Sequence, residues 1–322
     1  MARPAAVVAA MNQVSGPGVL GRTGLTVGRL GLGCAPLGNL YEAVAEQDAA
    51  GTVRAALAGG TRLFDTAPRY GHGVSEQRLG QVLAGVPRSE VVVATKVGYL
   101  LTDDGAEPDF SYDGTMRCLE ESLTRLGLDR VDIAHVHDPD HHEQEALAGA
   151  FRALVDLREQ GVVSAVGAGM NQSAMLERIV TRVDVDCVLL AGRYTLLDQD
   201  ALTGLLPACE ARGVGVVLGG VYNSGLLADP RPGAKYDYRA AEPHQVAAAL
   251  AIAEICARHG VPLKAAALQF GWGHPAVSTL VVGARTADEV RENLAMAQTT
   301  VPADLWAELR AAGLLPQEVP TP

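Results

Sequence analysis

From Arg29 onward, short apolar runs alternate with longer segments of helical periodicity. The short runs are rich in aliphatic and β-branched residues, which is typical of strands in a parallel sheet. Segment 145–160 instead carries apolar residues every three or four positions and is followed by Gly161, as expected for one amphipathic helix. Eight strands are predicted in chain order, at 29–34, 61–65, 91–97, 131–137, 162–168, 186–191, 214–219 and 279–283.

Eight strand–helix units predict an α/β fold, a single-domain (β/α)8 TIM barrel over residues 21–322, with a last outer helix at 302–312. The alternative is a doubly wound open sheet, which favours the glycine pattern GxGxxG after its first strand. Here "GLGCAPLG" places Pro36 where the third glycine belongs. Residues 1–20 are predicted to form a flexible tail. The long segment 220–243, rich in Gly and Pro, is typical of a lid or binding loop.

Composition narrows the functional classes. The chain has 322 residues, of which 48% are hydrophobic and 20% charged, enough to bury a large core. A net charge of −11, with no basic run, argues against a nucleic-acid partner, and no apolar stretch is long enough to predict a membrane span. The five cysteines form no CxxC pair, which favours a reducing, cytoplasmic location. The oligomeric state stays open.

Polar residues close three consecutive predicted strands. Asp65 ends the second, Lys96 closes "VVVATK" and His137 closes "VDIAHVH", while Tyr70 lies on the loop after Asp65. In a barrel, the carboxyl ends of the strands meet at one mouth, where active sites form. Each residue taken singly also fits a structural role. Asp65 could be a turn or cap acid and Lys96 a solvated strand end, while Tyr70 could be a packed loop aromatic and His137 a structural histidine.

Together these four side chains can transfer a proton. A phenol is a poor proton shuttle at neutral pH, but a neighbouring ammonium favours the phenolate. We therefore expect Lys96 to lower the pKa of Tyr70 toward the working range, with Asp65 as the counter-charge that keeps Lys96 protonated. His137 would hydrogen-bond the substrate oxygen and orient it.

The motifs "FDTAPRYGHGVSE", "ATK" and "VHDPD" resemble those of the aldo-keto reductases, from about residue 20 to 294. The resemblance implies a catalytic tetrad of Asp65, Tyr70, Lys96 and His137, and a barrel that binds NAD(P)H without a Rossmann domain. "GAGMNQ", "LAGRYTLLDQ" and "GGVYNSGLLAD" are similar to the sugar-oxidising branch, the D-threo-aldose 1-dehydrogenases (L-fucose or galactose dehydrogenases), and to pyridoxal dehydrogenases. The implied reaction passes hydride between C1 of an aldose-like lactol, or a related aldehyde, and NAD(P).

The same resemblance implies a dinucleotide segment, "VVGARTADEVRENL". Its pyrophosphate, ribose and adenine contacts would be Gly283, Ala284, Arg285, Glu289, Glu292 and Asn293, and a helix N-terminus there favours an anion. Asn171 is the expected carboxamide contact. Glu289 would repel a 2′-phosphate, so NAD is favoured over NADP, although Arg285 could serve that phosphate. Ala191 and Gly219 replace the family's usual glutamine and stacking tyrosine.

Loops and strand ends supply candidate contacts for a small sugar or aldehyde. They are Tyr41, His72, Arg193, Tyr194, Tyr222 and Trp272.

Three alternative functions stay open. His135 and His137 form an HxH pair, as in metal-dependent barrel hydrolases, although no metal site is expected because the other histidines lie in helical or loop segments. The second is a pyridoxal or general aldehyde reductase, and the third a nicotinamide-nucleotide redox sensor without turnover.

Overall fold

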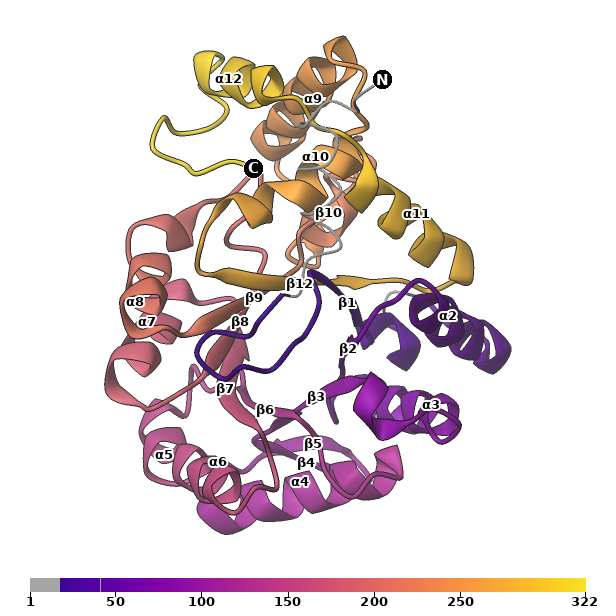
Figure 1. Cartoon of the computed structure of the whole chain (residues 1–322), viewed down its shortest axis with the longest axis vertical. Helices are drawn as coiled ribbons and strands as arrows, with labels where there is room; N and C mark the ends of the chain where they lie inside the picture. Colours follow the sequence, from indigo (N-terminus) through magenta and orange to yellow (C-terminus); the bar gives the residue numbers. More distant parts are fainter. Residues whose placement is uncertain (1–17, 41) are drawn as a thin grey trace, which may run out of the picture.

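The computed structural model of the chain describes residues 18–40 and 42–322 (Figure 1). Eight parallel strands close into a barrel in the order β1-β2-β3-β6-β7-β8-β9-β12. Their bounds are β1 Leu30–Gly33, β2 Leu63–Asp65, β3 Val92–Val97, β6 Ile133–His137, β7 Ala165–Met170, β8 Cys187–Ala191, β9 Gly215–Gly219 and β12 Val277–Gly283. The barrel and all eight predicted strands are confirmed, with the largest shift at the fifth.

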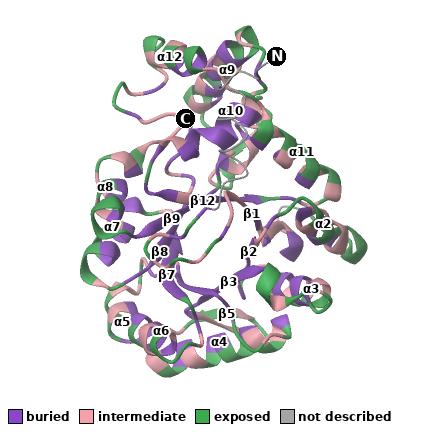
Figure 2. Cartoon of the chain, viewed as in Figure 1, coloured by how far each residue is buried: buried purple, intermediate pink, exposed green. Residues whose placement is uncertain are grey.

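Helices surround the strands, with their exposed faces outward (Figure 2). They are α2 Glu46–Ala58, α3 Val74–Leu83, α4 Tyr112–Leu126, α5 Glu143–Ala148, α6 Ala150–Glu159, α7 Ser173–Arg182, α8 Leu205–Arg212, α9 Pro243–Arg258, α10 Leu263–Phe270, α11 Ala287–Gln298 and α12 Ala303–Ala311. The last confirms the predicted outer helix. The single helix predicted over 145–160 is wrong, because the chain breaks at Gly149. A Cβ there would come within 2.5 Å of the Phe110 carbonyl oxygen.

The remaining secondary structure of the described residues consists of short 3-10 turns and two small hairpins. The turns are η1 Ala35–Gly38, η2 Arg88–Glu90, η3 Asp200–Leu202, η4 Asn223–Gly225 and η5 Gly271–Gly273. The hairpins, which the strand pattern did not predict, are β4–β5 (Tyr99–Thr102 and Gly105–Pro108) and β10–β11 (Lys235–Tyr236 and Arg239–Ala240). All five cysteines are buried and free.

Side chains fill the interior of the barrel. The buried cluster inside it includes Leu63, Ala94 and Ile133. Because side chains alternate along a strand, residues two or four positions further on also face inward. Asp65, Lys96 and His137 occupy those positions, at the carboxyl ends of their strands. The strand register therefore carries three of the four predicted catalytic groups to the mouth.

The amino-terminal segment closes the opposite end of the barrel. Val19 and Thr26 form a β-bridge, and Leu20 and Val27 are fully buried in the interior cluster. In Figure 1 this indigo segment crosses the end of the barrel that faces the viewer. The predicted tail at 1–20 is thus corrected at its end, since residues 18–20 belong to the packed barrel. Residues 1–17 lie outside the described residues.

Within the described ranges no single helix is long and apolar enough to cross a bilayer. Among the described helices, one bent pair, Pro243–Arg258 and Leu263–Gly273 at 106°, has the length and composition of a span when taken together.

Candidate active site

Lys96 and Asp65 form a buried ion pair at the mouth of the barrel. Lys96 is 1% exposed and Asp65 4% exposed. The Lys96 ammonium donates to both carboxylate oxygens of Asp65, at 2.9 and 2.8 Å, and to the carbonyl oxygen of Thr66 at 2.8 Å. Burial alone would lower the pKa of Lys96, but the attraction of Asp65 and Tyr70 outweighs it, so the net pKa is raised. Lys96 is therefore a fixed positive charge.

Tyr70 lies directly over this charge. The Lys96 Nζ is 4.7 Å from the centre of the Tyr70 ring. The loop that carries Tyr70 is pressed against the η1 turn, where a Cβ on Gly38 would come within 2.4 Å of the Tyr70 backbone. Gly38 permits this close approach, which fixes the position of the phenol.

The effect of Lys96 on Tyr70 differs from the expectation. Lys96 does lower the pKa of Tyr70, but desolvation by burial raises it by more, and the net pKa is above the ordinary value. The prediction that the ammonium brings this phenol into the neutral range is thus wrong for the protein alone. Tyr70 is a neutral phenol at pH 7, and in this state it can donate a proton to a substrate oxygen.

His137 forms the third side of the site. Its ring meets Tyr70 edge-on, with 5.9 Å between ring centres, and meets Tyr99 in the same way at 6.2 Å. Burial, and then the charges of Lys96 and Arg69, hold the pKa of His137 well below 6.5. A neutral imidazole offers one N–H donor and one acceptor to a substrate oxygen without carrying charge.

These groups surround one cavity of about 290 Å³. Its lining includes Tyr70, Lys96 and His137, together with Asn171 and small residues such as Gly169. The volume is close to the lower end of that found in small-molecule sites. The structure thus brings the predicted carboxamide contact, Asn171, into the same cavity as Tyr70, Lys96 and His137, while Asp65, the fourth residue of the predicted tetrad, lies behind Lys96 as its ion-pair partner.

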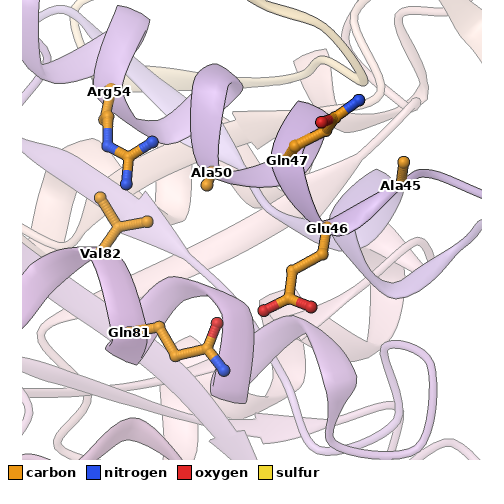
Figure 3. Close-up of a pocket in the computed structure, with 7 residues that line it drawn as sticks. All are labelled: Ala45, Glu46, Gln47, Ala50, Arg54, Gln81 and Val82. Atoms are coloured by element: carbon orange, nitrogen blue, oxygen red, sulfur yellow. The ribbon is translucent and has the colours of Figure 1, made fainter.

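A larger hollow lies elsewhere on the molecule. Its volume is about 590 Å³, and Figure 3 shows its lining side chains, which come from α2 and α3 and from Ala45. Its polar groups are Glu46, Gln47, Arg54 and Gln81, and none of them is a predicted site residue. The chemistry of the lining residues, rather than the volume, therefore identifies the mouth as the candidate active site.

The predicted dinucleotide segment runs from the end of β12 into α11. Thr286 caps the helix through its side chain, which accepts from the Glu289 amide. Arg285 forms ion pairs with Glu289 and with Glu42, both at 2.7 Å. Glu292 pairs with Lys264 at 2.6 Å. The carboxylate of Glu289 is thus largely neutralised by its neighbour, which weakens the repulsion expected for a 2′-phosphate.

The candidate substrate contacts lie in different places. Trp272 is at the wrong end of the barrel, because η5 precedes β12 and the indole donates to the Arg29 carbonyl oxygen at 3.2 Å. Tyr194 is 1% exposed and packs on Phe270, with 5.1 Å between ring centres, and so lies in the core. The expectation that Trp272 and Tyr194 face the mouth is therefore wrong.

The other candidates lie nearer the mouth, but in different roles. The Tyr222 hydroxyl donates to Asn293 at 3.0 Å, which places it beside the predicted dinucleotide segment. Arg193 pairs with Asp237 rather than facing the cavity. His72 is exposed on the Tyr70 turn, outside the described lining of the cavity. Tyr41 lies outside the described residues.

Sequence reasoning missed the three other polar or aromatic side chains of the lining. Arg69 pairs with Asp138 at 3.1 Å, and both line the cavity together with Tyr238. Arg69 and Asp138 directly adjoin Tyr70 and His137 in the quoted motifs, so their position was a usable signal. Tyr238 had only a general signal, since it lies in segment 220–243, predicted as a lid or binding loop, on the turn of a hairpin that the strand pattern did not predict.

His135 and His137 both face the barrel interior from β6. In the parts of the chain that the structure describes, no three His, Cys, Asp or Glu side chains are placed to hold a metal ion together.

A family model, "Aldo/keto reductase family", matches residues 29–313. The chain belongs to the aldo/keto reductase family. This reductase is 42% identical to the D-threo-aldose 1-dehydrogenase of a Pseudomonas species, over 91% of this chain and 96% of that protein. It is 40% identical to the pyridoxal 4-dehydrogenase of Microbacterium luteolum, over 92% and 97%. Among solved structures, the aldo-keto reductase AKR11C1 of Bacillus halodurans, in its holo form, superposes with a TM-score of 0.75 at 26% identity, covering 91% of this chain and 94% of that one.

Membership in the family establishes the reaction class. The protein is an NAD(P)-dependent oxidoreductase that acts on a small-molecule carbonyl substrate. The two most similar relatives named above act on different substrates, an aldose and pyridoxal, at nearly equal identity. The identity to these relatives therefore does not distinguish an aldose from pyridoxal as the substrate of this protein.

Proposed function

We propose that this reductase transfers hydride between C1 of an aldose, in its lactol form, and a nicotinamide cofactor. The observation that carries the proposal is the buried Lys96–Asp65 pair beneath Tyr70, with His137 at the edge of the same cavity. The similarity to D-threo-aldose 1-dehydrogenase over nearly the whole chain supports the choice of substrate.

Four residues of the chain have separate roles in the proposed reaction. Tyr70 exchanges a proton with the oxygen on C1, as donor in reduction and acceptor in oxidation. Lys96 stabilises the phenolate when the proton leaves, and Asp65 holds Lys96 in place. His137 positions the same oxygen with its neutral ring. Because the pKa of Tyr70 is raised, the fraction of Tyr70 that is ionised increases as the pH becomes alkaline. We therefore expect the rate of oxidation to rise from neutral toward alkaline pH. The neutral phenol already supports reduction at pH 7.

The mouth of the barrel fits a nicotinamide ring. Gly169 and Ala191 line the cavity, and a Cβ on nearby Gly219 would meet only ordinary contacts, the nearest at 3.5 Å. These small residues leave room for a flat ring beside Tyr70, and the Asn171 amide can hydrogen-bond a carboxamide. A nicotinamide held there by these residues would supply the hydride acceptor for oxidation or the hydride donor for reduction.

We propose that the dinucleotide extends from there to α11. Its phosphates would meet the backbone at Gly283 and Ala284, near the start of the helix, with Arg285 beside them. Glu289, Glu292 and Asn293 would lie near the adenosine. We favour NAD over NADP because Arg285 is already bound to two carboxylates and is less available to a 2′-phosphate.

Pyridoxal is the second candidate substrate. The 40% identity to pyridoxal 4-dehydrogenase over 97% of that protein is the observation in its favour. Both substrates present a ring and a carbon–oxygen group that exchanges hydride, so the same four residues serve either one.

Initial rates test the proposal directly. L-fucose, pyridoxal and propanal are each assayed with the matching oxidised or reduced form of NAD and NADP, at pH 7 and pH 9. The expected result is oxidation of L-fucose with NAD, faster at pH 9, and a kcat/KM above that for pyridoxal. A higher kcat/KM for pyridoxal would favour the second candidate. Tight nucleotide binding without turnover of any of the three would support a redox sensor instead.

A further inference from the structure

The hairpin β10–β11 has an unusual turn. Asp237 and Tyr238 occupy its two central positions, with φ of +47° and +65°. Both angles are in the left-handed region, where hairpin turns generally have Asn-Gly and where a bulky side chain is disfavoured. Such conformations persist only when the surroundings enforce them, and they gather at ligand-binding sites. The turn therefore calls for a structural cause and a functional reason.

The structural cause is Arg193, on the loop after β8. Its guanidinium donates to both carboxylate oxygens of Asp237 and lies 3.7 Å from Asp198. The Tyr236 hydroxyl donates to Asp198 at 3.1 Å, so two neighbouring residues of the hairpin connect to the same loop. A bidentate pair of this kind fixes orientation as well as distance.

The functional reason is the position of Tyr238. Its side chain lines the active-site cavity together with Tyr70, Lys96 and His137. It is also 61% exposed, the highest value among the large hydrophobic side chains of the described residues. An exposed aromatic ring beside the reacting groups offers a face to a sugar or pyridine ring.

We propose that Tyr238 determines specificity for ring-shaped substrates by packing against the ring of the bound molecule, and that Arg193 is a positioning residue that holds Tyr238 there through Asp237. The proposal rests on the proposed function, because it concerns the same cavity. It replaces the expectation that Arg193 touches the substrate itself. A substrate without a ring should gain nothing from Tyr238.

Kinetics of five variants test this proposal. Tyr238→Ala should raise KM for L-fucose or pyridoxal about two- to tenfold, the size of one aromatic contact, with KM for propanal and kcat little changed. Tyr238→Phe should stay near wild type. Arg193→Gln should reproduce the effect of Tyr238→Ala, and Arg193→Lys should restore part of it. Arg231→Gln is the matched control, since it breaks an exposed ion pair with Asp229 in the same segment.

A double variant separates positioning from general destabilisation. If Arg193 acts through Tyr238, Arg193→Gln adds little to Tyr238→Ala, whereas independent effects would multiply. Equal changes of KM for ring and open-chain substrates, or no change in Tyr238→Ala, would overturn the proposal.

Calorimetric titration of L-fucose and pyridoxal into wild-type and Tyr238→Ala protein distinguishes the two possible failures. If the protein turns over these substrates but neither their binding nor their KM depends on Tyr238, this inference alone is refuted. Binding that depends on Tyr238 without any turnover refutes the proposed function alone. Absence of both refutes both.

Discussion

His135 should make the stability of the protein depend on pH below 6.5. Its ring is fully buried inside the barrel, and within residues 18–40 and 42–322 neither ring nitrogen has a hydrogen-bond partner. Burial, and then the nearby charge of Lys96, lower the pKa of His135 to about 3. The folded protein therefore binds this proton far more weakly than the unfolded chain, in which the pKa is about 6.5.

The sign and size of the effect follow from proton linkage. A lowered folded pKa means that the stabilisation is present above pH 6.5 and is lost as the pH falls toward 3. At about 1.4 kcal/mol per pH unit, the loss from His135 is about 2 kcal/mol by pH 5 and about 4 kcal/mol by pH 3.

Urea unfolding, followed by tryptophan fluorescence at pH 7.5 and pH 5.0, measures this loss. His135→Leu keeps a side chain of similar size without the titrating group, so wild type should lose about 2 kcal/mol more than the variant between the two pH values. His137 is present in both proteins, and its contribution cancels. His141→Gln is the control, because that side chain is 90% exposed. If wild type and His135→Leu lose stability in parallel, the reasoning from desolvation is refuted.

Three further predictions concern the mouth of the barrel. Asp65→Asn leaves the Lys96 ammonium buried without its counter-charge, and should cost about 3–5 kcal/mol in the free energy of unfolding, measured in urea. Glu289→Gln removes one of the two carboxylates on Arg285, and should raise the affinity for NADP relative to NAD about tenfold, measured by fluorescence titration. Gly38→Ala should push the catalytic tyrosine out of position and lower kcat about 100-fold, measured by initial rates.

Each of these has a contradicting outcome. Asp65→Asn with wild-type stability would mean that the ion pair is not structurally important. An unchanged nucleotide preference in Glu289→Gln would place the 2′-position away from Arg285. Gly51→Ala is the control for Gly38→Ala, since a Cβ at Gly51 meets nothing within 4 Å. Equal rates in these two glycine variants would contradict the close approach at Gly38.

The sequence predicted the barrel because its strands are buried and continuous, and because strand ends carry polar residues. The alternation of side chains along each strand was enough to bring Asp65, Lys96 and His137 together. The break at Gly149 could not be predicted, since it depends on a backbone contact with a residue 39 positions away. Local periodicity contains no information about such contacts.

The substrate contacts were harder to predict from the sequence for a related reason. Trp272 and Tyr194 lie in segments whose direction is set by packing on α10 and β1, and polarity along the chain does not reveal that direction. Tyr238 depends on a turn held by Arg193, 45 positions earlier in the chain. The net pKa of Tyr70 likewise depends on burial, which outweighs the nearby ammonium and can be judged only from the packed site.

The central claim is that Tyr70 exchanges the proton in the reaction. Stopped-flow measurement of nicotinamide absorbance in a single turnover of Tyr70→Phe, with an aldehyde that the wild type reduces, tests it most directly. The account predicts a rate of hydride transfer about 100- to 10,000-fold below wild type, with the Kd of the cofactor unchanged within about twofold. A single-turnover rate within about tenfold of wild type would contradict it.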